Sequence, residues 1–414
     1  MPSGVMDMIS VAEAHKIIDD HITRLALEMV SINDTVGRVL AAEIIASFPQ
    51  PRFDNSAMDG FAVRAADTKG ASKKSPIDLK MVGLVSAVSP GDVVVGTGQC
   101  AQCMTGAPIP QGADGIVIVE DSSGYESGPE VQMYTEVQEG QHIRREGEEI
   151  QLGDLLINDG TCITTAEIGT MATFGYKDIQ VYRKPKLALF ATGDELVEPG
   201  NDLLPGQIYN SNIYVFEDLA RRAGAEVVLK NVIKDDKDSL KTFLADAFDS
   251  CDMVISSGGV SMGKFDYVRD VFMELGVKEH FWKVAQKPGR PLFFGSNSTS
   301  LIFGLPGNPV SAFIGFMEYV WPVLESMTGQ SRASTISAVL DESFPLDAVK
   351  TRYLFGNTWS EDGQLICTPS KKVGSHMLTS SLEANCIIVA DPGDIPLTKG
   401  AQISVRLLPW KSIK

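Results

Sequence analysis

The chain has few cysteines and few histidines for its length, and this scarcity excludes several kinds of site. Its 414 residues include six cysteines and five histidines. Small disulfide scaffolds need a high density of cysteines, and zinc-protease helices need an HExxH pattern that the sequence lacks. Cys100 and Cys103 form a CxxC, but no second pair completes a zinc site. We therefore interpret both as small buried side chains and expect no histidine-based metal catalysis.

Positive charge is also in short supply. The chain has 36 Lys and Arg against 53 Asp and Glu, which gives a net charge of −17. Because nucleic acids and anionic lipids are polyanions, such a surface repels both, and we expect neither as a partner. Any anionic ligand must then bind in a local basic pocket. The N-terminal stretch lacks the charged start and apolar core of a signal peptide, so we expect a cytoplasmic protein.

One apolar segment, residues 301–324, is long enough to cross a bilayer of about 30 Å as a helix. It is interrupted by prolines and polar residues, among them Pro306, Asn308, Pro309 and Glu318. These interruptions favour a buried strand, a turn and a core helix. We therefore expect no membrane span here.

The pattern of apolar residues divides the chain into four predicted domains of an α/β multidomain protein. Apolar residues near the N-terminus, from Val11 through Ile22 and Leu25, recur with helical spacing and predict a helix there. Helical structure is predicted again after Thr164, which can cap a helix with Glu167 near its start. Short valine-rich runs with glycine and proline turns lie between these stretches and predict an inserted β module. Strands then alternate with helices, which predicts parallel pairing in a doubly wound sheet, and a compact β domain follows. The predicted boundaries are 1–45 and 142–183 for a discontinuous helical domain, 46–141 for the β module, 184–328 for the doubly wound domain and 329–414 for the C-terminal β domain.

A glycine-rich stretch follows a buried apolar run in the predicted doubly wound domain. The letters SSGGVSMGKFDYV span residues 256–268, directly after the run 253–255. Ligands of open α/β sheets bind at the carboxyl ends of the strands, where this stretch lies. Glycines let backbone amides approach a ligand and serine hydroxyls add donors, so the pattern predicts a site for an anion such as a phosphate, although a glycine pair also occurs in ordinary turns. The candidate anion-binding residues here are Ser257, Gly258, Gly259, Val260 and Ser261.

Acidic residues follow three neighbouring elements of the same predicted domain. Glu195 follows the first strand, Asp235 follows the second, and Asp266 lies just beyond the glycines. Carboxylates that converge on one sheet edge repel one another unless a cation or a hydrogen-bond network compensates. Hard oxygen ligands of this kind suit Mg²⁺ held between protein and phosphate. The pattern therefore favours a magnesium site at this edge.

The local basic pocket that the net charge requires is predicted around a proline-glycine turn. The letters KVAQKPGRP place Lys283, Lys287 and Arg290 around this turn, although lysines in turns are commonly only solvated. The later motif LPGNPVSA predicts a rigid turn before a helix that begins near Pro309. We expect the amides of that turn to face the same crevice, which adds Pro306, Gly307, Asn308 and Pro309 to the candidate substrate-binding residues.

Several long motifs occur in one order along the chain: DNSAMDGFAVR, TGAPIPQGAD, ATGDEL, ISSGGVSMGKFDY, KPGRP and LPGNPVSA. Together they resemble the MoeA family of molybdopterin molybdenumtransferases, to which the C-terminal domain of gephyrin belongs. The resemblance covers nearly the whole chain. It implies that residues 184–328 bind molybdopterin and that residues 329–414 form a β barrel.

The resemblance also implies a reaction and an assembly. The reaction is Mg²⁺-dependent insertion of molybdate into adenylylated molybdopterin, which yields molybdenum cofactor and AMP. The assembly is a homodimer in which the pterin-binding domain of one protomer and the inserted β module of the other share each active-site cleft. A molybdopterin adenylyltransferase and apo-molybdoenzymes are further candidate partners.

Individual residue roles are implied where this sequence matches the family's motifs. Glu195, Asp235 and Asp266 match acidic active-site positions, and we assign them to Mg²⁺ and phosphate positioning. Lys283 and Lys287 match basic positions that would receive the anionic ligand. The remaining matches are Asp59 and Thr105, which are functional positions in the inserted module, and Arg352 and Ser375, which face the cleft from the C-terminal domain.

Two other functions stay open at this point. An adenylyltransferase that makes the adenylylated pterin resembles residues 186–328 alone, but it would leave the inserted module and the C-terminal domain without a role. A non-catalytic scaffold, as gephyrin is at synapses, is disfavoured because this chain shows no fused second pterin-binding domain and no long linker.

Overall fold

The computed structural model describes residues 8–87, 92–234, 236–259 and 267–413, which fall into two compact units. Unit 1 comprises residues 1–42, 159–168 and 178–414, and unit 2 comprises residues 43–158 and 169–177. Asp235, Val260, Ser261 and Asp266 of the predicted site lie outside the described residues.

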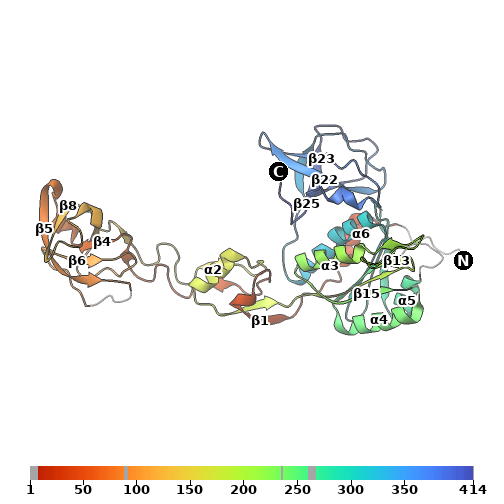
Figure 1. Ribbon diagram of the computed structural model, residues 1–414, viewed down its shortest axis with the longest axis horizontal. Helices are drawn as coiled ribbons and strands as arrows, with labels where there is room; N and C mark the ends of the chain where they lie inside the picture. The colour runs from red at the N-terminus through yellow and green to blue at the C-terminus, as the bar shows by residue number, and fades with distance from the viewer. Residues whose placement is uncertain (1–7, 88–91, 235, 260–266, 414) are drawn as a thin grey trace. The chain divides into compact units, whose positions relative to one another are not determined.

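A six-stranded sheet forms the centre of unit 1 (Figure 1). Its order is β15 (Glu226–Ile233), β12 (Lys186–Thr192), β16 (Met253–Ser257), β20 (Leu301–Leu305), β19 (Pro291–Ser296) and β17 (Lys278–Lys283). The first four strands are parallel to one another, as predicted. The last two are antiparallel additions. Short connections join β17, β19 and β20 without a crossover helix, and such connections permit antiparallel pairing only.

Helices cover both faces of this sheet because both faces of its strands are apolar. On β12, Leu187 and Leu189 belong to the apolar core on one face, whereas Ala188 and Phe190 belong to the core on the other. The first face is covered by α1 (Val11–Asp19), α3 (Asn212–Arg222), α6 (Pro309–Gly315), the π-helix Phe316–Val320 and α7 (Trp321–Met327), and the second by α4 (Lys237–Ser250) and α5 (Val268–Glu274).

The apolar run 301–324 therefore forms a core strand, a turn and buried helices, as predicted. Within the described residues, no helix is both long and apolar enough to cross a bilayer.

The C-terminal part of unit 1 is a closed five-stranded β barrel, as the family resemblance implied. Its strands follow the order β22 (Thr351–Glu361), β23 (Gln364–Pro369), β21 (Ile336–Leu340), β25 (Gln402–Leu407) and β24 (Cys386–Ala390). Pairing of β24 with β22 closes the ring. The short strand β18 (Gln286–Lys287) pairs in parallel with β22 and thereby attaches a turn of the doubly wound domain to the barrel.

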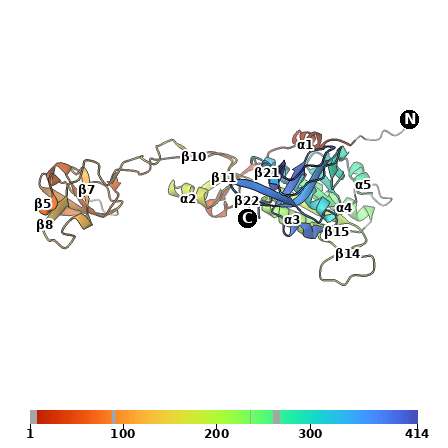
Figure 2. The same cartoon turned by 90° about the horizontal axis from the view of Figure 1, so that it is seen from above.

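The remaining elements of unit 1 are short. β1 (Leu27–Ser31) pairs with β11 (Asp178–Tyr182), and β13 (Leu196–Val197) pairs with β14 (Ile208–Tyr209). The loop that carries β14 projects from the rest of the unit (Figure 2).

Unit 2 contains a five-stranded sheet, which agrees with the predicted β module. Its order is β7 (Gly115–Ile118), β4 (Gly60–Val63), β6 (Gln99–Cys103), β5 (Ser72–Val85) and β8 (Glu130–Thr135). Cys100 and Cys103 are buried on β6, as expected, and burial raises their thiol pKa values to about 12 and about 11. The smaller pairs are β2 (Ile44–Ile45) with β10 (Leu155–Ile157) and β3 (Asn55–Ser56) with β9 (Ile143–Arg144).

The predicted helical stretches are shorter in the structure than the apolar pattern suggested. The N-terminal helix α1 ends at Asp19, and the expected continuation through Ile22 and Leu25 is wrong. Asp19 and Asp20 disfavour further helix because a negative charge near a helix C-terminus opposes the helix dipole. Leu25 is nevertheless buried in the core of unit 1. Its apolar side chain therefore indicated a buried position, although the chain there is not helical. The second predicted helix is present as α2 (Thr165–Thr173).

The aromatic core of the central sheet is the basis of a stability prediction. Phe303 on β20 is fully buried, and its ring centroid lies 5.0 Å from that of Phe294. Phe303→Ala should lower the free energy of unfolding by roughly 3–5 kcal/mol, measured by urea denaturation. Leu382→Ala, at a side chain that is 70% exposed, should change it by less than about 0.5 kcal/mol. Similar losses in the two variants would contradict the burial of Phe303.

Candidate functional site

Two adjoining cavities lie at the carboxyl ends of the parallel strands in unit 1, where ligands bind in open α/β sheets. The sheet-side cavity, of about 520 Å³, is lined by residues at the carboxyl ends of β12 and β16 or just beyond them, among them Thr192, Glu195 and Ser257. The barrel-side cavity, of about 430 Å³, lies between the doubly wound domain and the barrel. The two cavities share one wall, which consists of Gly258, Gly259, Gly307 and Asn308.

The shared wall consists of the two turns that the sequence singled out. Ser257 ends β16 and Leu305 ends β20, and these strands are neighbours, so the turns that follow them meet at the sheet edge. Gly258 N–H donates to the Leu305 carbonyl at 2.9 Å, which ties one turn to the other. Helix α6 begins at Pro309, as predicted, and Asn308 occupies the position before it.

Asn212, which sequence reasoning missed, ties the same two turns together from a third element. It is the first residue of α3, and its Nδ2 donates to Ser257 Oγ at 2.7 Å and to the Gly307 carbonyl at 2.8 Å. Its side chain lines the sheet-side cavity and is mostly buried. The available signal was an amide side chain in the first turn of a helix at this sheet edge. Nothing in the sequence showed that it reaches both turns.

Both glycines of the shared wall have backbone conformations that favour glycine. Gly258 has φ +83° and Gly259 has φ +70°. A Cβ on Gly259 would lie 2.3 Å from Val268 Cγ2 and 2.8 Å from Thr192 Oγ1. A Cβ on Gly258 would meet only the Thr192 carbonyl, at 3.4 Å. Both positions therefore favour glycine because of their backbone conformation, and Gly259 also leaves no room for a Cβ.

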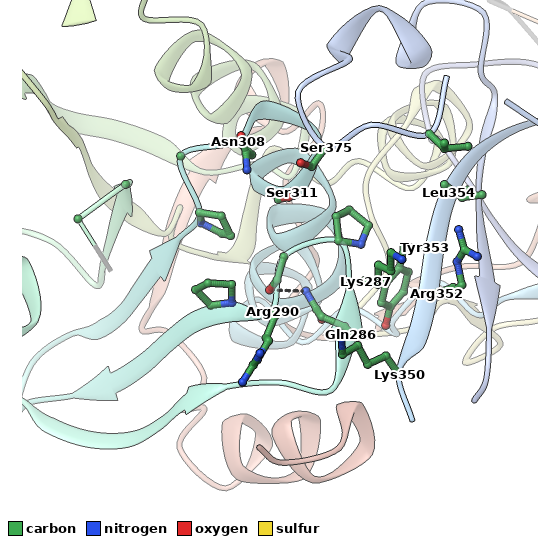
Figure 3. A pocket seen from close by; sticks show the side chains of 18 residues that line it. Gln286, Lys287, Arg290, Asn308, Ser311, Lys350, Arg352, Tyr353, Leu354 and Ser375 are labelled. Carbon is green, nitrogen blue, oxygen red and sulfur yellow. Dashed lines mark hydrogen bonds between the residues drawn. The ribbon is translucent and has the colours of Figure 1, made fainter. Parts of the chain in front are cut away.

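The barrel-side cavity is the local basic pocket that the net charge required. Its lining includes the four cationic side chains Lys287, Arg290, Lys350 and Arg352, and none of the described lining residues is acidic. Figure 3 shows Asn308 and Ser375 on one side of this cavity and Arg290, Gln286 and Lys350 on the other. An anion of modest size is therefore the ligand that the lining favours.

Backbone pairing brings these cations together from distant parts of the sequence. Lys287 on β18 and Arg352 on β22 are direct partners in the parallel pairing of the two strands. The Val310 N–H donates to the Ser375 carbonyl at 3.0 Å, which ties the loop carrying Ser375 to α6. Burial lowers the pKa of the Arg352 guanidinium, whose Nη1 donates to the Pro345 carbonyl at 2.7 Å. Lys350 and Tyr353 were not predicted, and only the strand register places them here.

One carboxylate near this cavity offsets part of its charge. Hydrogen bonds from the Val349 and Lys350 backbone, together with the nearby Lys350 and Lys287 ammonium groups, lower the pKa of Asp347. Asp347 is therefore ionised at neutral pH. The cavity keeps a positive balance because its four cations outnumber this acid.

The structure separates Lys283 from the other predicted basic residues. Lys283 is the last residue of β17, and its Nζ lies 4.4 Å from the centre of the Trp282 ring. It lines neither cavity. Lys287 and Arg290 do line the barrel-side cavity, as do Pro306, Arg352 and Ser375, and Pro309 lines the sheet-side cavity.

The predicted magnesium ligands are only partly within the described chain. Glu195 lines the sheet-side cavity and offers the hard oxygen that Mg²⁺ prefers. Asp235 and Asp266 lie outside the described residues. Asp236 instead accepts from the Ser239 N–H at 2.8 Å and caps α4. Among the residues that the structure describes, no group of three or more His, Cys, Asp and Glu is placed to hold a metal ion.

Unit 2 places Asp59 and Thr105 in direct contact. β4 and β6 pair with Gly60 opposite Cys103, so Asp59 before β4 and Thr105 after β6 lie at the same end of the sheet. Asp59 Oδ1 accepts from the Thr105 N–H at 2.7 Å and from Thr105 Oγ1 at 2.9 Å. These hydrogen bonds lower the pKa of Asp59 and keep it ionised. Both side chains are exposed.

The two glycines of the shared wall are expected to respond differently to substitution. Gly258→Ala should cost about 1–2 kcal/mol, because the left-handed conformation is strained for alanine. Gly259→Ala should cost roughly 1–3 kcal/mol more, because the added Cβ overlaps Val268 and Thr192. Urea denaturation followed by tryptophan fluorescence measures both losses. Equal losses would show that the close packing around Gly259 is absent.

Comparison with known proteins places this architecture in one family. The MoeA N-terminal region (domain I and II) matches residues 9–175, a probable molybdopterin binding domain matches residues 188–326, and the MoeA C-terminal region (domain IV) matches residues 337–408.

Similarity to individual relatives spans nearly the whole chain. The molybdopterin molybdenumtransferase of Bacillus subtilis is 34% identical over 92% of this chain and 90% of its own length. That of Staphylococcus epidermidis is 32% identical over 98% of this chain and 97% of its own length. A crystal structure of the molybdopterin biosynthesis moeA protein from Pyrococcus horikoshii, 30% identical, superposes with a TM-score of 0.82 and covers 97% of this chain and 99% of that chain. The chain therefore belongs to the MoeA family of molybdopterin molybdenumtransferases.

Proposed function

We propose that the chain inserts molybdate into adenylylated molybdopterin in an Mg²⁺-dependent reaction that releases AMP and yields molybdenum cofactor. Family membership supports the overall activity. The observation that carries the proposal is the barrel-side cavity, where four cations and no described acid line a space beside the glycine turns. Molybdate is a dianion of the kind that this lining favours.

The two cavities suit the two substrates. The sheet-side cavity offers glycine amides and the Ser257 and Thr192 side chains at the carboxyl ends of parallel strands, which suits the phosphates of a nucleotide-bearing pterin. The barrel-side cavity suits the oxyanion. Because Gly258, Gly259, Gly307 and Asn308 border both cavities, ligands in each would lie next to one another, as insertion of molybdate into the pterin requires.

Cleavage of the phosphoanhydride builds negative charge on the leaving phosphate. Cations and backbone amides held in place before the reaction stabilise that charge more in the transition state than in the ground state. Glu195, with Asp235 and Asp266, would hold Mg²⁺, which supplies positive charge against the phosphates when bound. Lys287, Arg290 and Arg352 hold and orient the oxyanion.

We further propose that the active enzyme is a homodimer in the cytoplasm, with each site completed by the partner's inserted β module. The family resemblance supports this arrangement, and Asp59 and Thr105 form an exposed hydrogen-bonded pair suited to such a role. The projecting β13–β14 region exposes Leu204 and Ile208, at 66% and 55%, which is apolar surface of the kind that subunit contacts cover. A molybdopterin adenylyltransferase would supply the substrate, and apo-molybdoenzymes would receive the product.

AMP release distinguishes this reaction from the alternatives. Purified protein is incubated with Mg²⁺ and molybdate, together with either adenylylated molybdopterin or ATP plus molybdopterin. We expect AMP and molybdenum cofactor only from the first mixture, because the chain acts on the adenylylated pterin. Formation of adenylylated pterin from the second mixture would support an adenylyltransferase, and inertness in both would support a scaffold. Omission of Mg²⁺ tests the metal dependence.

Subunit mixing tests the shared site. Asp59→Asn and Glu195→Gln should each inactivate the homodimer, because each damages both sites. In a mixed dimer one site receives both damaged residues and the other receives neither, so roughly a quarter of wild-type activity should return after random exchange. Subunit exchange is verified by native mass spectrometry. Activity that stays at the level of the single variants after verified exchange would refute the shared site.

A further inference from the structure

A buried polar chain lies beneath the barrel-side cavity and is not used by the proposed chemistry. Gln286 lines the cavity but is only 1% exposed. Its Oε1 accepts a hydrogen bond from the Tyr319 hydroxyl, and its Nε2 donates to the Gly289 carbonyl at 3.0 Å. Figure 3 shows the second of these bonds as a dashed line. Gln286 therefore joins a fully buried tyrosine to the turn that carries Lys287 and Arg290.

The two ends of the Gln286 amide are not equivalent, and its two partners use different ends. The Gly289 carbonyl can only accept, so it takes the NH₂ end of the amide, and the oxygen end accepts from the Tyr319 hydroxyl. Burial raises the pKa of Tyr319 well above its ordinary value, which keeps this hydroxyl protonated and able to donate at neutral pH.

Tyr319 is itself held firmly from several sides. It lies in the π-helix Phe316–Val320, an irregularity that often accompanies a functional site. The ring of His15 stacks on the Tyr319 ring with centroids 5.2 Å apart. The adjacent Glu318 is buried and bonds to His15 Nε2 at 2.8 Å and to Arg406 Nη2 at 3.1 Å. Helix α1, the π-helix and barrel strand β25 are thus joined around one tyrosine.

The turn beyond Gln286 carries two of the cations of the cavity. Gly289 has φ +85°, and Lys287 and Arg290 on either side of it both belong to the cationic lining. Gln286 supplies an uncharged hydrogen bond across the base of the turn. The same bond holds the turn between Lys287, which the strand pairing places beside Arg352, and Arg290.

We propose that Tyr319 is a positioning residue for oxyanion binding, acting through Gln286 on the turn that carries Lys287 and Arg290. This inference rests on the proposed function for the identity of the oxyanion, molybdate. The positioning itself does not depend on it. Removal of the hydroxyl leaves Gln286 Oε1 buried without its donor, and the amide loses one of the two hydrogen bonds that hold it.

The test compares Tyr319→Phe with a matched control, Tyr182→Phe. Tyr182 is 7% exposed, and its hydroxyl accepts from Arg24 Nη1 at 3.2 Å, outside both cavities. Hydrogen exchange measured by mass spectrometry should speed up over residues 284–292 in Tyr319→Phe and stay at the wild-type rate there in the control. The molybdate Kd from calorimetry should rise roughly 3- to 10-fold in Tyr319→Phe, with kcat at saturating molybdate within about twofold of wild type. Lys287→Ala should weaken molybdate binding further and serves as the positive control.

The outcomes separate the two proposals. Unchanged exchange over 284–292 together with an unchanged molybdate Kd in folded Tyr319→Phe would overturn the positioning role. Faster local exchange in a protein whose wild type binds no molybdate would overturn the proposed function and leave the positioning role standing. If Tyr319→Phe fails to fold, Gln286→Glu is tested in its place. The carboxylate of the new side chain can still accept from the Tyr319 hydroxyl but cannot donate to the Gly289 carbonyl. Exchange over 284–292 must then rise, and wild-type exchange in that variant would refute the role of the amide.

Discussion

The gathering of four cations around the barrel-side cavity is the constraint on which the rest of the site depends. Like charges repel one another, and solvent screens this repulsion most at Lys287 and Arg290, whose side chains are exposed. The protein holds them by backbone pairing, since Lys287 on β18 and Arg352 on β22 are register partners whatever their charge. Asp347 offsets part of the charge from the edge. In the proposed function, the positive charge that remains attracts the oxyanion substrate.

The proposed reaction also requires that two ligands approach one another closely, and the glycine turns meet this requirement. Gly258 and Gly307 border both cavities, so the wall between them contains little side-chain bulk. A wall made of backbone keeps a defined shape only if other residues fix that backbone in place. Asn212 does this with two hydrogen bonds, one to each turn. The site therefore combines a wall of glycine backbone between the cavities with a side chain from α3 that fixes this wall.

Much of the fold was predictable because its signals are local. Alternating strands and helices with short connections restrict a chain to few topologies, and the parallel strands β12, β15 and β16 followed directly from that pattern. The helix starting at Pro309 was predicted from a proline after a turn. Where local signals conflicted, prediction failed: Ile22 and Leu25 repeat with helical spacing, yet Asp19 and Asp20 end the helix before them.

The sequence by itself determined the composition of the site: an acidic chain that needs a basic pocket, glycines and serines after a central strand, and motifs in the order of one family. Tertiary structure decided which of these residues meet. Lys283 and Lys287 are close in sequence, yet one ends β17 against Trp282 and the other enters the cavity through β18. No sequence pattern assigned a role to Gln286, Asn212 or Tyr319, and only the structure shows which groups they contact. The physical reason is that hydrogen-bond partners and strand register are set by contacts between residues far apart in the chain, which no local pattern encodes.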